Sequence, residues 1–211
     1  MTAKESEGQA SPKFESAFKG FHIRTEQHSS FDAMRIEIAR ELRVAIEELL
    51  ATSAPIGELE EIRNSISQAV SGLKSRPHSH DYSGPAEGSL APMNTFLDRS
   101  PIIGGINPLS VPMEMSIEGD GGKDSTVVGR ATFGSAYEGP PGCVHGGFIA
   151  AYFDEVLGMA QSLSGNPGMT VNLTVDYRSP TPLMKPVVFR GWVGSIDGDR
   201  KSTRLNSSHR T

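Results

Sequence analysis

Residues 142–158, GCVHGGFIAAYFDEVLG, decide how the rest of this chain is interpreted. Apolar side chains lie at helical spacing around nearly the whole circumference of this stretch, so it predicts a helix enclosed by other elements. Two details are unusual for a core helix. It opens on His145, Gly146 and Gly147, although glycine weakens helices, and its apolar body carries Asp154. Either Asp154 lies at an exposed edge of the helix, or the helix has a chemical task.

The composition limits what the protein can be. The 211 residues are 36% hydrophobic and 21% charged, a mixture typical of chains that bury a core. The net charge of -5 argues against a protein that binds nucleic acid or anionic membranes, because such partners attract basic faces. Cys143 is the single cysteine, no apolar run is long enough for a membrane span, and the first residues do not form a secretory signal. The sequence therefore predicts a cytoplasmic protein without an intrachain disulfide.

The N-terminal part of the chain has three regions. Residues 1–30 are polar and aperiodic, which predicts disorder. Residues 31–75 contain two amphipathic stretches that predict a helical hairpin. We expect this hairpin to pack on the main domain, as a docking or dimer-support extension. Residues 76–94 have the composition of a linker.

Strand patterns begin after the linker. Alternating or β-rich segments, separated by glycine- and proline-rich turns, predict four strands, at residues 111–118, 125–133, 169–177 and 187–194. The order is therefore strand, strand, helix, strand, strand. One long apolar helix among antiparallel strands is an α+β arrangement, in which the sheet has to wrap around the helix.

At this point the chain resembles a known family. Three features are similar to the hot-dog acyl-CoA thioesterases: YEGPPGCVHGG, the spacing from His145 to Asp154, and GMTVNLTVDYRSPTPL. The greatest similarity is to the phenylacetate-pathway (PaaI-like) type and related thioesterase superfamily members. The resemblance covers residues 95–198 and implies a hot-dog domain, an antiparallel sheet wrapped around one central helix.

The C-terminal residues are expected to be foreign to the protein. Residues 199–209, DRKSTRLNSSH, resemble the in-frame translation of a sequencing adaptor. We therefore assign residues 199–211 to a non-native tail and set residues 202–211 aside, while residues 199–201 fit either source. The hot-dog domain is then expected to be truncated, because the family fold closes with further strands beyond this point.

The start of the helix has a possible chemical use. The first turn of a helix leaves backbone N–H groups unpaired, and glycine lets a ligand approach them closely. Such donors stabilise the oxyanion that forms when a thioester is attacked. The alternative is that Gly146 and Gly147 are needed only for a tight entry into the helix. Asp154 has apolar neighbours, so a partly desolvated carboxylate suited to a base or nucleophile is expected.

The distance between these groups requires a second chain. Gly146 and Asp154 are eight residues apart, which is about 12 Å along a helix. An oxyanion donor and a base that act on one carbonyl must both lie within about 3 Å of the reacting atoms. Two antiparallel helices related by a twofold axis satisfy this condition. The resemblance implies the same arrangement, with the active site at a dimer interface.

The resemblance also implies individual roles. It makes Asp154 the catalytic carboxylate, Gly146 the backbone oxyanion donor, His145 the histidine before it, and Thr170 the hydroxyl that positions water or the carboxylate. Some relatives carry an Asn a few residues before the histidine, where this chain has YEGPPG.

The remaining candidates are substrate-binding residues and metal ligands. The role of the missing Asn is unfilled or passes to Tyr137 or Glu138, which join Gly147 as the candidate substrate-binding residues. The linker residues His78, His80 and Asp81 lack a second ligand cluster, so no metal is expected. Cys143 fits packing better than nucleophilic catalysis.

The sequence therefore predicts an enzyme, an acyl-CoA thioester hydrolase that acts as a homodimer or a dimer of dimers (a homotetramer). No cofactor is expected, since coenzyme A is part of the substrate. Two alternatives stay open. One is a non-catalytic hot-dog module that binds acyl-CoA. The other is a hot-dog hydratase or dehydratase, which would need a catalytic His where this helix has apolar side chains.

Overall fold

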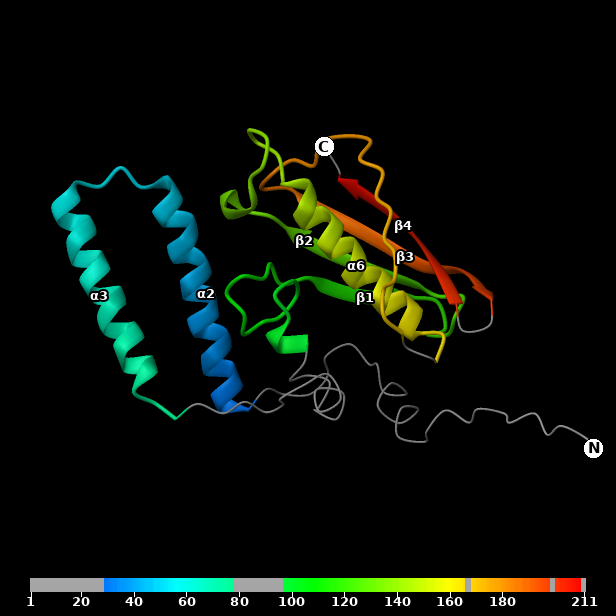
Figure 1. The fold of residues 1–211 in the computed structure, drawn as a ribbon, viewed down its shortest axis with the longest axis horizontal. Coiled ribbons are helices and arrows are strands. Elements are labelled where there is room, and N and C mark those ends of the chain that lie inside the picture. Colours follow the sequence, from blue (N-terminus) through cyan, green and yellow to red (C-terminus); the bar gives the residue numbers. More distant parts are fainter. Residues whose placement is uncertain (1–28, 78–96, 166–167, 198–199, 210–211) are drawn as a thin grey trace, which may run out of the picture.

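The structure, a computed structural model, describes residues 29–77, 97–165, 168–197 and 200–209. An N-terminal pair of helices precedes a sheet with one long helix on it (Figure 1). The elements are α2 (Ser30–Ala51), α3 (Ile56–Lys74), β1 (Glu114–Glu118), β2 (Thr126–Thr132), the short 3₁₀ helix η1 (Ser135–Tyr137), α6 (Gly146–Ser162), β3 (Pro186–Asp197) and β4 (Arg200–His209). The expected α+β class is confirmed.

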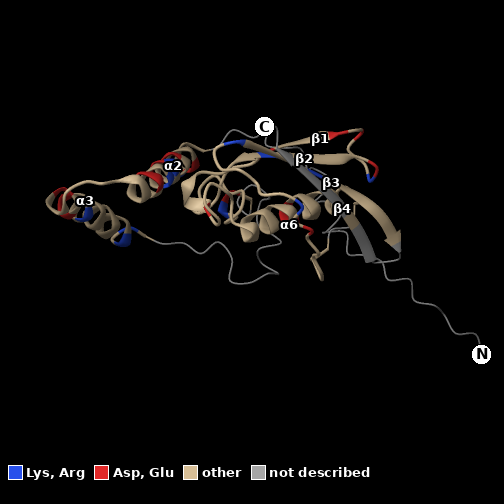
Figure 2. Ribbon diagram, turned by 90° about the horizontal axis from the view of Figure 1, so that it is seen from above, with Lys and Arg blue, Asp and Glu red and all other residues tan. Residues whose placement is uncertain are grey.

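The sheet has four strands in the order β1-β2-β3-β4, and every neighbouring pair is antiparallel. Helix α6 packs on one face of this sheet, against β2, β3 and β4, and Figure 2 shows the sheet and the helix as two layers. The buried side of α6 follows the three- and four-residue spacing of a helix: Ile149, Tyr152, Val156, Met159 and Ala160. The helix predicted from residues 142–158 is therefore present, with its first turn at Gly146.

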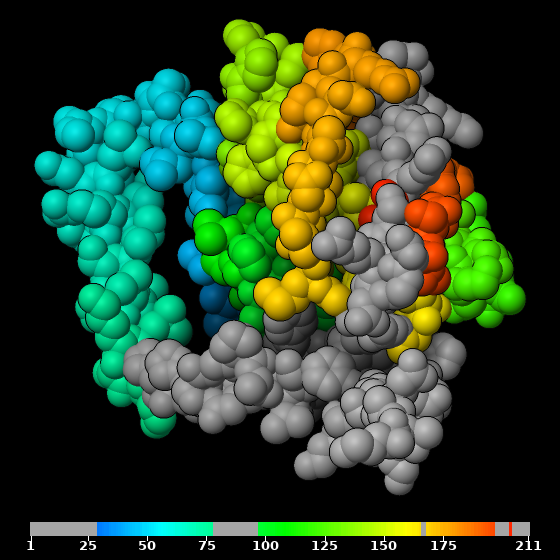
Figure 3. Space-filling view, turned by 45° about the vertical axis from the view of Figure 1, so that its right-hand side comes forward, coloured from blue at the N-terminus to red at the C-terminus, as the bar shows by residue number. Residues whose placement is uncertain are grey.

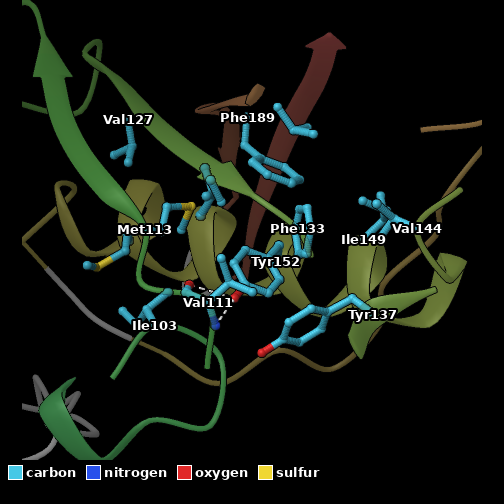
Figure 4. Close-up of a cluster of buried hydrophobic side chains, with 14 of the residues drawn as sticks. Ile103, Val111, Met113, Val127, Phe133, Tyr137, Val144, Ile149, Tyr152 and Phe189 are labelled. Atoms are coloured by element: carbon cyan, nitrogen blue, oxygen red, sulfur yellow. Dashed lines mark hydrogen bonds between the residues drawn. The ribbon is translucent and has the colours of Figure 1, made fainter. Parts of the chain in front are cut away.

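The core lies between α6 and the sheet (Figure 4). Three aromatic side chains fill its centre: Phe133, Tyr152 and Phe189 are almost completely buried. The ring of Phe133 meets the ring of Tyr152 edge to face at 4.8 Å, and Tyr152 stacks on Phe189 at 5.8 Å. These contacts join the loop after β2, helix α6 and strand β3, so the helix is held by both central strands.

Strand β3 approaches α6 closely at one residue. A Cβ atom at Gly191 would lie 2.9 Å from Cγ1 of Val156, so only glycine lets the two elements meet there. The next residue, Trp192, is half-buried and lies between Thr126 on β2 and Arg204 on β4. The sequence predicted this strand at residues 187–194, and the structure extends it at both ends.

The first predicted strand is shorter than expected. The sequence predicted a strand over residues 111–118, but β1 begins at Glu114. Val111 and Met113 are buried, as their alternation indicated, although they precede the strand. Pro112 has no N–H to donate to a ladder, which explains the late start. The returning strand expected at residues 125–133 is confirmed as β2.

The strand predicted at residues 169–177 is wrong: the described residues 168–178 contain no strand. A strand needs a neighbour with a free edge, and the outer edge of β3 is paired with β4. The segment instead runs across the surface beside α6, and Figure 3 shows it in yellow and orange as a ridge. Met169 and Val171 are 94% and 98% exposed, whereas Leu173 and Val175 are half-buried, so the described residues cover only part of the apolar face of this segment.

The tail that the sequence analysis set aside forms part of the sheet. Residues Arg200–His209 make β4, which pairs with β3 along nearly its whole length. The expectation that the sheet lacks a strand after residue 198 is therefore wrong for this structure. The physical reason is that an antiparallel edge supplies hydrogen-bonding groups to any backbone that can lie extended beside it, whatever its side chains.

The two N-terminal helices differ in their contacts. The side-chain oxygen of Ser29 accepts the N–H of Asp32 and caps α2, and Ala39 on that helix is 2% exposed. Helix α3 contains no buried residue. Two helices thus occupy the region expected to form the helical hairpin, and α2 packs on the main domain. In the ribbon of Figure 2, acidic and basic residues are distributed along both helices.

Some expectations fall outside the described residues. The predicted disorder of residues 1–28 and the predicted linker from residue 78 onwards lie there, as do His78, His80 and Asp81. Within the described ranges, no helix combines the length and apolarity needed to cross a membrane. The same ranges hold no group of three or more His, Cys, Asp or Glu side chains suited to a metal ion.

Candidate active site

The entry to α6 is built by a tightly bonded loop. His145 is the N-cap residue of the helix, and its N–H donates to the carbonyl of Tyr137 over 2.8 Å. The side chain of Glu138 accepts the N–H of Gly142 at 2.6 Å, and Gly142 has a φ of 72°, in the left-handed region that glycine adopts at little cost. This loop fixes the direction from which the chain enters the helix.

The first N–H groups of α6 have different partners. The N–H of Gly147 donates to Nδ1 of His145 at 3.0 Å, so the histidine side chain caps the helix. Among the described residues, no hydrogen bond uses the N–H of Gly146. Of the two glycines, Gly146 therefore has the donor that remains available to a ligand. This is the donor that the sequence analysis assigned to the oxyanion.

A tyrosine that the sequence analysis did not select covers this turn. Tyr177 donates its hydroxyl hydrogen to the carbonyl of Gly146 at 2.9 Å. A Cβ atom on Gly146 would lie 3.2 Å from Cε1 of the Tyr177 ring. The glycine is therefore needed for close packing as well as for access to its N–H. Tyr177 was missed because its alternating segment predicted a strand residue that faces the core.

The predicted carboxylate and hydroxyl are in contact. The hydroxyl of Thr170 donates to Oδ1 of Asp154 over 2.7 Å, and Asp154 is half-buried on α6. The adjacent Glu155 is also half-buried, and burial, followed by the charge of Asp154, raises the pKa of the Glu155 carboxyl. Thr170 bonds only Oδ1 of Asp154, and Oδ2 of this carboxylate has no hydrogen-bond partner among the described residues.

Tyr137 and Glu138 lie in the loop but are engaged in holding it. Tyr137 is buried, its ring packs edge to face on Phe148 at 4.9 Å, and its hydroxyl donates to the carbonyl of Leu109. Glu138 is bonded to the loop itself. Both residues therefore shape the entry to α6, and their role toward a substrate stays a prediction. Cys143 is a free, half-buried thiol in the same loop.

The predicted residues form two groups. His145, Gly146 and Gly147 lie at the start of α6, whereas Asp154 and Thr170 meet about two turns later. Eight residues of helix place these groups about 12 Å apart along the axis. One chain therefore brings the carboxylate of Asp154 together with the Thr170 hydroxyl, but it does not bring them to the first turn of α6.

Comparisons with known proteins give a consistent result. Residues 141–200 match the family model described as the Thioesterase superfamily. Acyl-coenzyme A thioesterase THEM4 of Xenopus laevis is 41% identical over 70 residues, or 33% of this chain and 32% of that protein. THEM4 of Rattus norvegicus is 43% identical over 61 residues, or 29% of this chain and 26% of that protein. The aligned part thus spans about a third of the length of these relatives or less.

The fold has a solved counterpart. A crystal structure of a thioesterase superfamily protein superposes with a TM-score of 0.71 at 28% identity, covering 83% of this chain and 87% of that chain. The expected hot-dog fold is therefore confirmed. Residues 97–209 make up little more than half of this chain, so coverage of 83% has to include residues before position 97. The similarity consequently extends into the N-terminal region.

Proposed function

We propose that this chain, whose fold and residues 141–200 are those of the thioesterase superfamily, hydrolyses acyl-CoA thioesters to a free acid and coenzyme A. The observation that carries the proposal is the available N–H of Gly146 at the start of the same helix that holds Asp154 against Thr170. A thioesterase needs both an anion donor and a proton acceptor, and α6 supplies one of each.

The donor stabilises the intermediate. When water attacks the thioester carbon, the carbonyl oxygen becomes an oxyanion. The N–H of Gly146, reinforced by the positive end of the α6 dipole, would bind that oxygen. Removal of one such donor typically costs about 10²- to 10³-fold in turnover. The capping of Gly147 by His145 supports a single backbone donor at this position.

The carboxylate moves the proton. Thr170 holds Oδ1 of Asp154, so Oδ2 is free to accept a proton as water attacks. The carbon–sulfur bond then breaks, and the coenzyme A thiolate takes the proton back from Asp154. Direct attack by Asp154 on the thioester carbon, followed by hydrolysis of the anhydride, uses the same two groups. Both routes need only side chains, backbone and water.

The distance along α6 between the N–H of Gly146 and the carboxylate of Asp154 supports a homodimer. A second copy placed antiparallel along α6 would bring its Asp154 opposite Gly146 of the first. The unpaired segment beside α6 exposes Met169 and Val171 almost fully, and Phe148 in the first turn is 36% exposed. Apolar exposure of this kind marks an association surface. We infer that this face meets a second copy, in a dimer or in a dimer of dimers.

Thiol release over a panel of acyl-CoA substrates tests the proposal. The Asp154→Asn variant is expected to lower kcat at least 100-fold, because general-base catalysis typically contributes about 10² to 10⁴. Asp124→Asn removes the same charge from an 83% exposed side chain in the loop between β1 and β2, outside α6, and is the matched control. Full turnover by a folded Asp154→Asn protein contradicts the proposal. Tight acyl-CoA binding without turnover by the unaltered chain would indicate the non-catalytic module.

Mixing two inactive variants tests the shared site. Gly146→Pro removes the donor and Asp154→Asn removes the acceptor. A heterodimer of the two contains one site with both natural groups, so the mixture is expected to regain part of the lost turnover. Subunit exchange demonstrated by native mass spectrometry without recovered turnover would show that the groups do not act across an interface.

A further inference from the structure

The N-terminal helix α2 reaches the loop that leads into α6. The carboxylate of Glu47 accepts the N–H of Ser135 at 2.8 Å, the N–H of Ala136 at 3.1 Å and the hydroxyl of Ser135. A Cβ atom at Gly134 would overlap the Glu47 carboxylate, so glycine lets the two approach closely. The helix η1 has no side-chain cap of its own, so Glu47 caps it from a residue 88 positions earlier.

A second polar contact of α2 lies one turn earlier. Arg43 donates to the carbonyl of Asn107 at 2.9 Å and to that of Gly105 at 3.5 Å. Between α2 and the domain is a cavity of about 210 Å³ whose lining includes Arg43, Glu47 and Tyr137. Arg43 and Glu47 therefore hydrogen-bond α2 to the domain beside this cavity.

The contact at η1 continues into the candidate site. Tyr137, the last residue of η1, accepts the N–H of His145 through its carbonyl and packs its ring on Phe148. His145 is the N-cap of α6, directly before Gly146. A displacement of η1 therefore moves the oxyanion donor. Misplacement of a reacting group by about 1 Å can cost about 100-fold in rate.

We propose that Glu47 is a positioning residue, whose carboxylate fixes η1 and through it the N-terminus of α6, so that docking of α2 places the N–H of Gly146 for catalysis. This inference rests on the proposed thioesterase function. It assigns a role to the N-terminal helix, which lies outside the residues that match the thioesterase family model.

The charge state of Glu47 agrees with this role. Burial raises the pKa of the Glu47 carboxyl, but the hydrogen bonds from Ser135 and Ala136 outweigh it and leave the pKa below its usual value. The group thus stays ionised at neutral pH, and an ionised carboxylate accepts hydrogen bonds only. An amide in its place would turn N–H donors toward the N–H groups of η1.

The test compares Glu47→Gln with Glu48→Gln, an exposed neighbour on the same helix, in the full chain. Two measurements are made well below the melting temperature: kcat and KM for thiol release, and the backbone amide resonance of Gly146 in a ¹H–¹⁵N spectrum. Glu47→Gln is expected to lower kcat about 10- to 100-fold with KM within about twofold, and to shift the Gly146 resonance. Glu48→Gln is expected to change neither.

The possible outcomes separate this inference from the proposed function. If the unaltered chain hydrolyses no acyl-CoA, the proposed function fails, but the Gly146 resonance still reports whether Glu47 positions α6. An unshifted resonance or an unchanged kcat in Glu47→Gln overturns the inference. If Glu47→Gln does not fold, Ser135→Ala decides instead, because it removes only the hydroxyl donor and should shift the same resonance by a smaller amount.

Discussion

The hydroxyl of Tyr152 ties the central helix to the chain before β1, and its removal should be costly. The oxygen accepts the N–H of Val111 at 2.9 Å, and its proton is shared between the carbonyls of Val111 and Ile102. Tyr152 is 1% exposed and Val111 is 9% exposed, so water cannot replace the lost partner. Burial raises the pKa of Tyr152 far above its usual range, and the phenol stays protonated.

The magnitude follows from the groups left behind in Tyr152→Phe. One buried N–H without a partner costs about 1–3 kcal/mol, and a carbonyl that loses its donor adds about 0.5–1.5 kcal/mol. The expected loss is therefore about 2–4 kcal/mol, a large part of the roughly 5–15 kcal/mol that stabilises a typical domain. The ring remains in place, so its aromatic contacts with Phe133 and Phe189 are kept.

Urea unfolding measures this loss as a lower midpoint at an unchanged slope. Tyr137→Phe is the matched control. Its hydroxyl makes one hydrogen bond, to the carbonyl of Leu109, a residue that is 64% exposed, so water can replace it. That variant is expected to lose no more than about 1 kcal/mol. A Tyr152→Phe protein within about 0.5 kcal/mol of the unaltered chain, or equal to the control, would refute the reasoning.

Three further changes have expected outcomes. Gly191→Ala places a methyl group 2.9 Å from Val156 and should lower stability by about 1–3 kcal/mol in the same urea assay. Glu155→Gln should raise the melting temperature at neutral pH but not below pH 4.5. The raised pKa of Glu155 means that the folded state binds this proton more tightly than the unfolded state does. Stability therefore falls as the pH rises from the ordinary glutamate pKa of 4.5 through the raised pKa of Glu155. An equal gain in melting temperature at all pH values would contradict this. Thr170→Val removes the hydroxyl donor to Asp154 and should lower kcat about tenfold, which thiol release measures.

The sequence predicted the elements whose evidence is local. The helical spacing in α2, α3 and α6 and the β-rich run of β2 after a glycine-rich loop are each contained within one segment, so they could be recognised without knowledge of the partners. Residues 169–177 show the limit of that method. Their alternation indicates an extended chain, but whether it joins a sheet depends on the strand that pairs with β3.

One contact of the candidate site could likewise be predicted before the structure was known, and another could not. The contact between Asp154 and Thr170 could be anticipated from the family resemblance, and the structure places the two side chains together. Glu47 could not be anticipated. A glutamate on an amphipathic helix is normally solvated, and only the tertiary docking of α2 shows that this one reaches Ser135. Long-range polar contacts of this kind leave no periodic signal in a sequence.

The location of Trp192 has a practical consequence for spectroscopy. It is the single tryptophan of the chain, and it lies in β3 between its partners on β2 and β4. Its fluorescence therefore reports on the sheet alone. Far-ultraviolet circular dichroism is weighted instead toward the N-terminal pair, because α2 and α3 contain 22 and 19 residues and α6 contains 17. Since α3 has no buried residue, we expect the dichroic signal to fall at a lower temperature than the tryptophan fluorescence changes during thermal unfolding. The difference between the two midpoint temperatures then measures how independently α2 and α3 melt.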